Sequence, residues 1–450
     1  MDFLSRLPDL ILVNIFGLMH SERDIFHLIS ASPHFLSIYT HYRHSITRQR
    51  LSAILKLDVD GSILQDAQAI IQFPAILGCN KGDSRRIKKC LDTWDERGFP
   101  NPLMEERNPE SVTSLYNFFA RVIFFIEDYL SKAADPFPVR AYMTLPTMSR
   151  LAPTMRFKGQ DIDIEHVPLN DLSQSGRRRI LQAFIRFELR CKVYRTPAQP
   201  KVKGTIYMDI MRKADEHLTI EEHEEIYCVG EYFKGMYGAI IAHSNDDVWF
   251  PDRPAPATVV VDELVDDKQH ELSHANDYGL LFPDNHYIGL NTYLFDADIQ
   301  GLRWIQMPCS GLDSITSLLQ YINSGSRSGP QIRDWVKNFP IQNSHCRWTS
   351  RGHFAQRYRL YSISADVKQW ATEMQFSEPV NLRDLKVSAT GMYRQRAMTF
   401  FTGSTGRQPL LPSWKNLFSQ QERLRGIVYL AEHRGRRRSQ KWQDYWAGRT

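Results

Sequence analysis

The sequence lacks most of the features that would assign it to a specialised class of protein. Its six cysteines are too far apart to form a metal knuckle or a redox pair; they stand at positions 79, 90, 191, 228, 309 and 346. No apolar run reaches the roughly 20 residues that a bilayer span needs, and the opening "MDFLSRLPDL" does not read as a secretory signal. We therefore expect reduced thiols, no membrane partner, and a cytoplasmic or nuclear location.

Motifs for catalysis and cofactor binding are also scarce. The chain has no G-x-x-x-x-G-K phosphate loop, no G-x-S-x-G elbow, and no G-x-G-x-x-G after a strand. It shows no repeat with a period of about 20 to 50 residues. The 56 basic against 51 acidic residues leave a formal net charge of +5, a small excess that does not imply nucleic-acid binding. We expect no nucleic-acid partner and no cofactor.

What is present is the composition and patterning of a folded, mainly α-helical protein. Apolar residues make up 42% of the chain and charged residues 24%. The stretch "SLYNFFARVIFFIEDYL", residues 114–130, reads as a buried core helix, and Thr219 with Glu222 forms a capping box that opens another helix. We expect a helical segment at 51–135, a proline-rich linker at 136–160, and a mostly helical body with loop-rich insertions at 161–450.

One stretch, "HELSH", matches the His-Glu-x-x-His pattern of zinc proteases. On a helix, His270 and His274 would share one face and could hold zinc, with Glu271 as general base. Charged residues precede the motif, however, and a turn-like Asn-Asp-Tyr-Gly follows it. The glycine and third histidine of the extended motif are replaced by Asp277 and Leu280. A solvated polar loop or helix end, without metal, is therefore the favoured interpretation.

Two clusters of charge have a plain and a functional interpretation. The acidic "EHLTIEEHEEIY" mixes His217 and His223 with Glu221, Glu222, Glu224 and Glu225, and we favour a solvated helix face over a metal site. The basic "RGRRRSQK", residues 434–441, is read as a solvated tail rather than a nuclear-import signal or a contact for an acidic partner.

The N-terminal region has the best-defined local signals. Residues 7–43 read as three short helices. The second opens at Ser21, with Asp24 three residues on, a variant of the capping box that complements the helix dipole. The third opens with Ser32 as N-cap and Pro33 at the first helical position.

The first of these helices is apolar around almost its whole circumference. Pro8 suits its first turn, because the missing N–H needs no partner there. Only Asp9, Asn14 and Gly17 interrupt the apolar residues, which are Leu10, Ile11, Leu12, Val13, Ile15, Phe16, Leu18 and Met19. Such a helix must be covered on more than one side, and a unit of about 40 residues rarely buries enough surface to be stable alone. Either the rest of the chain covers the second face or another protein does.

In order and spacing, this region resembles the F-box, especially that of the large fungal group. The resemblance rests on a Leu-Pro start, aliphatic residues on a helix, an S-x-x-D turn and a final helix with an aromatic residue, and it covers about a tenth of the chain. One departure is Leu10, where many F-boxes carry an acidic residue. The matching residues are Leu7, Pro8, Ile11, Leu12, Ile15, Phe16, Leu18, Ser21, Asp24, Leu28, Ile29 and Phe35.

The resemblance implies a function. F-boxes dock on the Skp adaptor of Skp–cullin–F-box ubiquitin ligases, so residues 1–50 would bind that adaptor and, through it, the cullin ligase. The rest of the chain, which carries no expected catalytic residue, would bring an unidentified protein target close to the ligase for ubiquitin-dependent degradation. The residues expected to bind the adaptor are Leu7, Pro8, Leu10, Ile11, Leu12, Ile15, Phe16, Leu18, Leu28, Ile29 and Phe35.

Two alternatives stay open at this point. One is a zinc-dependent hydrolase that uses the "HELSH" stretch. The other is an F-box module that binds the adaptor without entering a complete ligase.

Overall fold

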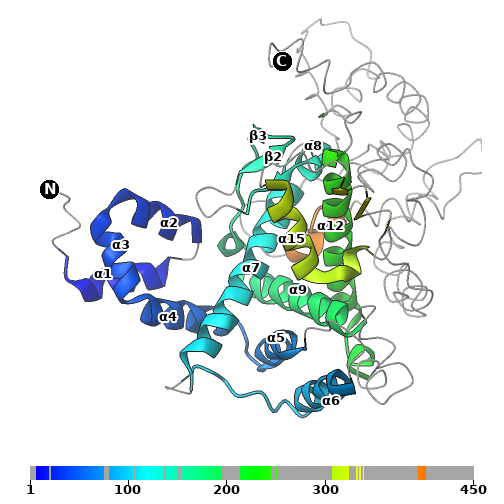
Figure 1. Cartoon of the computed structure of the whole chain (residues 1–450), viewed down its shortest axis with the longest axis horizontal. Helices are drawn as coiled ribbons and strands as arrows, with labels where there is room; N and C mark the ends of the chain where they lie inside the picture. Colours follow the sequence, from blue (N-terminus) through cyan, green and yellow to red (C-terminus); the bar gives the residue numbers. More distant parts are fainter. Residues whose placement is uncertain are drawn as a thin grey trace, which may run out of the picture.

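The computed structural model describes residues 7–19, 22–74, 81–104, 108–135, 138–148, 154–194, 213–244, 250, 307–323, 331–332, 334–335, 338 and 394–401. Within these ranges the chain is mainly α-helical, as the sequence predicts. A small N-terminal module and a larger body lie side by side, and both are visible in Figure 1.

Four helices form the N-terminal module: α1 (Asp9–Leu18), α2 (Glu22–Ala31), α3 (Pro33–His41) and α4 (Arg43–Leu55). They enclose a hydrophobic cluster of their own, which consists of Leu12, Val13, Phe16, Ile25, Phe35, Ile38 and Ile46. The three short helices predicted for this region are therefore confirmed, and a fourth helix leads from them into the body.

The starts of the helices agree with the sequence in position but not in every hydrogen bond. Pro8 stands at the N-cap of α1, one residue before the helix. Ser32 stands at the N-cap of α3 with extended backbone, and Pro33 follows at the helix start. The Ser32 hydroxyl makes no capping hydrogen bond, however. We attribute the sharp start of α3 to Pro33, which disfavours a helical conformation for the residue before it.

The helix α4 packs against α1 on one side and against the body on the other. On the α1 side, a Cβ at Gly17 would lie 2.1 Å from the side chain of Gln49, so the glycine permits the two helices to approach closely. On the body side, the buried guanidinium of Arg50 lies over the ring of Tyr116 in α7, 5.2 Å from its centroid.

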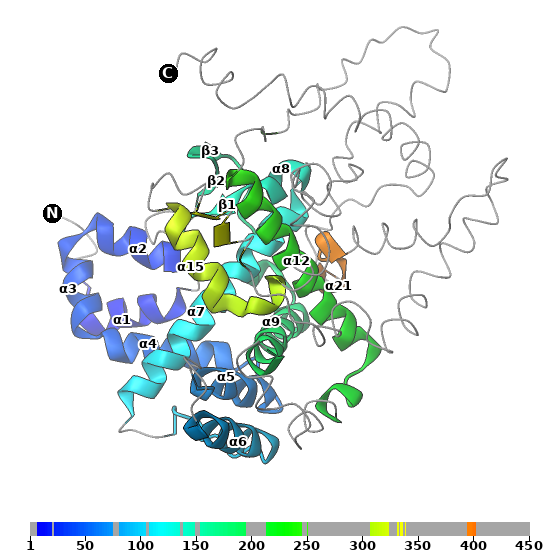
Figure 2. The ribbon, with the colours of Figure 1, turned by 45° about the vertical axis from the view of Figure 1, so that its right-hand side comes forward.

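One hydrophobic core runs through the body. Its main helices are α5 (Ser62–Gln72), α6 (Lys81–Asp95), α7 (Pro109–Ala134), α9 (Gln174–Tyr194), α12 (Ile220–Ser244) and α15 (Gly311–Asn323), with short 3-10 turns at Leu169–Asp171 and Met307–Ser310. Figure 2 shows α7, α9 and α12 at its centre. The prediction of a buried core helix at 114–130 is confirmed, because α7 contains that range and buries Phe119, Val122 and Phe125 completely.

The helices α9 and α12 pack together as the sequence pattern indicates. The rings of Phe187 and Phe233 stack with centroids 5.3 Å apart. The capping box at the start of α12 is confirmed: the Thr219 N–H donates to Glu222 Oε2 at 2.8 Å, and the Glu222 N–H donates to Thr219 Oγ1 at 3.2 Å.

A proline-rich linker is predicted at 136–160, but the described residues of this range, 138–148 and 154–160, are part of the body. It contains α8 (Pro138–Met143) and the strands β1 (Leu145–Pro146) and β2 (Met155–Phe157), and β3 (Gln160–Ile162) completes an antiparallel sheet in the order β1-β2-β3. Pro138 opens α8 and Pro146 lies in β1. Apolar residues of these elements reach the main core, namely Tyr142, Met143, Leu145 and Phe157.

The boundaries predicted at 51–135 and 161–450 do not separate two units either. The main core takes side chains from Leu51 at one end to Phe401 at the other. The last of these belong to a short segment, residues 394–401, which ends in α21 (Met398–Phe401). Figure 2 shows α21 beside α12, and the segment packs against both α9 and α12.

Candidate functional site

The helix α1 has one face inside the module and one in solvent. Leu12, Val13, Phe16 and Gly17 are buried against the other module helices. The opposite face carries Leu10, Ile11 and Leu18, which are 73%, 46% and 69% exposed. With about 3.6 residues per turn, these three side chains lie within about 100° of one another around the helix axis, with the exposed Asn14 between them. We call this face the α1 stripe. Several exposed apolar side chains on one helix face are a mark of a protein–protein contact, whereas single exposed leucines are not.

The structure sorts the predicted adaptor-binding residues into three groups. The first is buried within the module: Leu12, Phe16 and Phe35. The second is partly buried at the edge of its cluster: Leu7, Ile15, Leu28 and Ile29. The third is exposed: Pro8, Leu10, Ile11 and Leu18. Only the third group, with the edge of the second, offers a surface to a partner, and the first group holds α1 in position.

The buried group has a clear packing role. The rings of Phe16 and Phe35 meet edge to face with centroids 5.9 Å apart, and the ring of Tyr39 lies 5.4 Å from that of Phe16. Edge-to-face pairs of this kind add to the stabilisation gained from burial. Loss of either phenylalanine would therefore alter the surface only by loosening α1.

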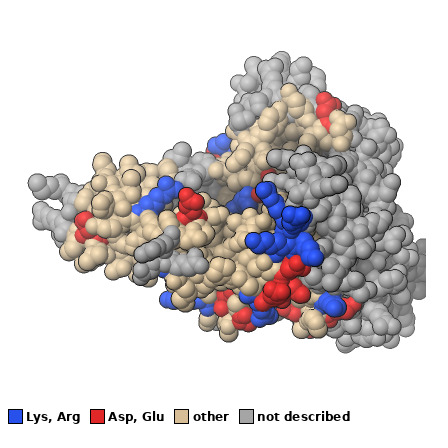
Figure 3. Space-filling view, turned by 60° about the horizontal axis from the view of Figure 1, so that its bottom comes forward, with Lys and Arg blue, Asp and Glu red and all other residues tan. Residues whose placement is uncertain are grey.

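The sequence reading missed one exposed apolar residue of the module, Leu36 of α3, which is 48% exposed. Phe35 and Ile38, which are three residues apart on α3, are buried on another side of the helix. The only signal in the sequence was an apolar residue on the side of α3 away from these two. In Figure 3 the module, at the left, carries few charged side chains.

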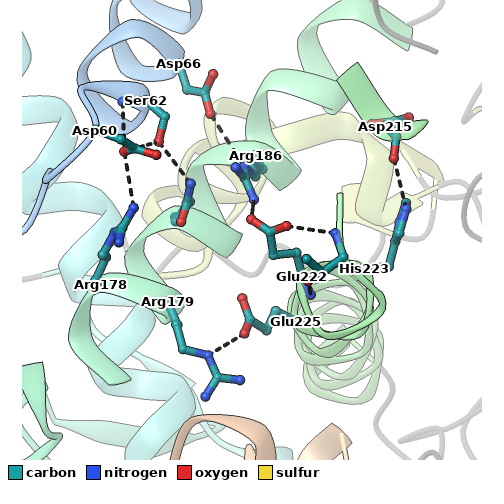
Figure 4. A network of polar contacts seen from close by, with 12 residues as sticks. Asp60, Ser62, Asp66, Arg178, Arg179, Arg186, Asp215, Glu222, His223 and Glu225 are labelled. Atoms are coloured by element: carbon teal, nitrogen blue, oxygen red, sulfur yellow. Dashed lines mark hydrogen bonds and ion pairs between the residues drawn. The ribbon is translucent and has the colours of Figure 1, made fainter. Parts of the chain in front are cut away.

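A second cluster of functional residue types lies on the body, where α9 arginines meet carboxylates (Figure 4). Arg179 Nε lies 2.6 Å from Glu225 Oε1, and Arg186 Nη1 lies 2.5 Å from Glu222 Oε1. Arg190 pairs with the carboxylate of a further residue, Asp215. The acidic stretch at the start of α12 is therefore paired with arginines, in place of the solvated face predicted for it. Figure 3 shows basic and acidic side chains next to each other on the body.

The network continues into the interior at Asp66 of α5. Its Oδ1 accepts a hydrogen bond from Trp94 Nε1 at 2.7 Å, and its Oδ2 lies 3.9 Å from Arg186 Nε. Burial raises the pKa of Asp66, while these two partners act in the opposite direction. The pairs join α5, α9 and α12, and we assign them a structural role because each charge has its partner within the fold.

The described part of the chain contains no cluster of three or more His, Cys, Asp or Glu side chains that could hold a metal ion. The "HELSH" stretch and the basic cluster at 434–441 lie outside the described residues. Four cysteines of the described ranges, Cys90, Cys191, Cys228 and Cys309, are buried and form no disulfide. Burial raises the pKa of Cys90 to about 12, so its thiol stays protonated and unreactive near neutral pH.

A comparison with models of protein families, with curated proteins and with solved structures found no match to this chain. Within the described ranges, no helix has the length and apolar character needed to cross a bilayer. Among the described residues, the exposed stripe of α1 is the surface that best supports a function.

Proposed function

We propose that this chain is a non-catalytic subunit of a Skp–cullin–F-box ubiquitin ligase, which recruits a protein target and docks on the Skp adaptor through α1. The observation that carries the proposal is the stripe of Leu10, Ile11 and Leu18, which stays exposed although the module has a core of its own. The resemblance of residues 7–35 to the F-box names the partner that such a stripe would fit.

The stripe offers enough apolar surface for a specific contact. Full burial of a leucine or isoleucine side chain contributes on the order of 1.5–3 kcal/mol. Part of that gain offsets the entropy lost on association. A groove that covered Leu10, Ile11 and Leu18, together with the edge residue Ile15, would be a helix-in-groove contact.

The module is also fixed to the body. The contacts of α4 on both sides hold it, so a target bound by the body would be carried at a set distance from the ligase. The chain would then act through proximity, by raising the concentration of the target near the transferred ubiquitin.

Co-purification with the Skp adaptor tests this proposal. The intact chain should bring the adaptor down, and an Ile11→Asp/Leu18→Asp variant should not, because two carboxylates would have to be buried in an apolar contact. Val59→Asp is the matched control. The exposed fraction of Val59 is 76%, similar to the 69% of Leu18, but Val59 lies on the body, so this variant should still bind.

Two outcomes would count against the proposal. Failure of the intact, folded chain to bind the adaptor would overturn the adaptor role. Equal binding by the Ile11→Asp/Leu18→Asp variant would show that the stripe is not the contact. If the adaptor binds but cullin is absent from the purified complex, the module acts outside a complete ligase.

A further inference from the structure

Residues 394–401 are held by the body through contacts that resemble the recognition of a peptide. Two tyrosine hydroxyls bind their backbone: Tyr129 Oη donates to the carbonyl of Arg394, and Tyr142 Oη donates to the carbonyl of Gln395 at 2.6 Å. Both tyrosines are buried in the main core, so their hydroxyls are fixed in place. Hydrogen bonds to main-chain carbonyls hold a segment without specifying its side chains.

Two arginine side chains supply the specificity. Arg394 makes a forked contact with Glu224 of α12, with Nε 2.6 Å from Oε1 and Nη2 2.8 Å from Oε2, and its guanidinium lies 4.9 Å from the ring centroid of Tyr227. Such bidentate pairs are strong and directional. The arginine at the first position of the segment is thus recognised by the carboxylate of Glu224 and the ring of Tyr227 together.

The second arginine binds the end of a helix. Arg396 Nη1 donates to the carbonyl of Ala133 at 2.8 Å and to that of Asp135 at 2.6 Å. Both carbonyls belong to the C-terminal end of α7, where the helix dipole favours a cation. We call the residues that hold the segment, namely Tyr129, Ala133, Asp135, Tyr142, Glu224 and Tyr227, the segment cradle.

The chain's own segment fits this cradle imperfectly. Gln395 is buried at 1% exposure, and neither its amide nitrogen nor its amide oxygen has a hydrogen-bond partner in the described structure. An unsatisfied buried polar group costs about 1–3 kcal/mol. Ala397 has a φ of 50°, in the left-handed region that disfavours residues other than glycine by roughly 1–2 kcal/mol.

We propose that the segment cradle is a binding site for an Arg-x-Arg peptide, and that residues 394–401 occupy it as a replaceable ligand in cis. A partner segment with the same two arginines, an apolar side chain in place of Gln395 and a glycine in place of Ala397 would remove both penalties. The inference does not depend on the adaptor role. If that role holds, the cradle is where a target would be recognised.

A synthetic, fluorescently labelled peptide tests the cradle directly, without any adaptor. The peptide has the sequence of residues 394–401 with Gln395→Leu and Ala397→Gly, and its binding to the full chain is followed by anisotropy. In the intact chain it competes with a tethered segment, which acts at an effective concentration of about millimolar. The full chain with Arg394→Ala/Arg396→Ala should therefore bind the peptide at least about tenfold more tightly than the intact chain.

Two controls make the result specific. Adding Glu224→Gln to the Arg394→Ala/Arg396→Ala chain should weaken peptide binding by about tenfold or more, because the forked contact is lost. A peptide of the same composition in scrambled order should bind no better than background. No binding to a folded Arg394→Ala/Arg396→Ala chain, or binding that is indifferent to Glu224→Gln, would overturn the proposal.

If the Arg394→Ala/Arg396→Ala chain fails to fold, a second measurement tests whether the peptide displaces residues 394–401. Hydrogen exchange of residues 394–401 is measured in the intact chain, with and without excess peptide. Displacement predicts faster exchange in this segment when the peptide is present, and the scrambled peptide should have no effect. Unchanged exchange at saturating peptide would show that the segment is a fixed part of the core and would overturn the proposal.

Discussion

Ile46 and Leu51 lie little more than one turn apart on α4, yet each is fully buried in a different hydrophobic core. Ile46 belongs to the cluster of the N-terminal module and Leu51 to the main core of the body. A helix is stiff over such a length, so the module cannot turn relative to the body without exposing one of these side chains. The α4 helix therefore couples the docking surface to the rest of the molecule.

Truncating these two residues separately should loosen the two cores separately. Large-to-small changes in a core cost about 2–5 kcal/mol, and the small module has little stability to lose. Ile46→Ala should therefore speed amide hydrogen exchange in α1 to α3 and leave α7 unchanged, as mass spectrometry can measure. Leu51→Ala should instead speed exchange in α5 and α7. An even increase across the whole chain in both variants would contradict two coupled but distinct cores.

The two faces of α1 should differ sharply in their effect on stability. Ile11→Asp/Leu18→Asp changes exposed side chains, so the free energy of unfolding should stay within about 0.5 kcal/mol of the parent. Phe16→Ala removes a buried ring and should cost about 3–5 kcal/mol. Urea denaturation, with fluorescence and circular dichroism as probes, measures both. A large loss in the Asp variant would mean that the stripe contributes to the fold.

The sequence was sufficient to predict elements that are specified locally. The helices of the module, the buried α7 and the Thr219–Glu222 capping box follow from caps and periodicity, which act over a few residues. The burial of α8, β1 and β2 could not be predicted from such local signals. Proline spacing indicated a linker there, and only the long-range packing of Tyr142 and Phe157 shows that this segment belongs to the core.

The partners of the charged residues could not be predicted either. The sequence of α7 shows Arg121 and Asp128 only as interruptions in an apolar run. The structure gives Arg121 a partner in α15, with its Nη1 2.8 Å from Asp313 Oδ1. It places Lys132 Nζ 2.8 Å from Asp128 Oδ2, which also accepts from Tyr232 Oη at 2.7 Å. The α1 stripe was visible as apolar residues, but which of them face solvent depends on how α1 packs on α4.

Stability should depend on pH through Glu188, whose side chain is 1% exposed. Its Oε2 accepts a hydrogen bond from the Leu312 N–H at 2.7 Å, at the start of α15. Burial raises the pKa of Glu188 from 4.5 to about 7, against the opposing effect of Lys192. The folded chain therefore binds this proton more tightly than the unfolded chain. The contribution to stability is full below pH 4.5 and is lost as the pH rises through about 7.

Glu188→Gln removes this ionisation and keeps an oxygen that can accept from Leu312. One unit of pKa shift corresponds to about 1.4 kcal/mol. Between pH 5 and 7.5, the unfolding free energy of the parent should therefore fall by up to about 3 kcal/mol more than that of the Glu188→Gln variant. Urea unfolding of both proteins at several pH values measures the difference. Parallel curves for parent and variant would show that Glu188 does not titrate in this range. Glu222→Gln is a suitable control, because the pKa of Glu222 is lowered and its titration lies below this window.

Gly176→Ala should loosen residues 394–401 without changing any residue of that segment. In most helices such a change stabilises by about 0.5–1 kcal/mol, because glycine is the more flexible residue. Here an added Cβ would lie 2.9 Å from the carbonyl oxygen of Phe400, and a backbone atom cannot turn aside as a side chain can. We expect the sign to reverse, with faster hydrogen exchange at 394–401 and, if the segment cradle binds peptide, tighter binding of the labelled peptide.

Gly230→Ala in α12 is the matched control, since the nearest atom to its Cβ, Cε2 of the Phe187 ring, is 3.4 Å away. This variant should leave both readouts unchanged. Equal behaviour of the two variants would mean that the contact at Phe400 does not hold the segment.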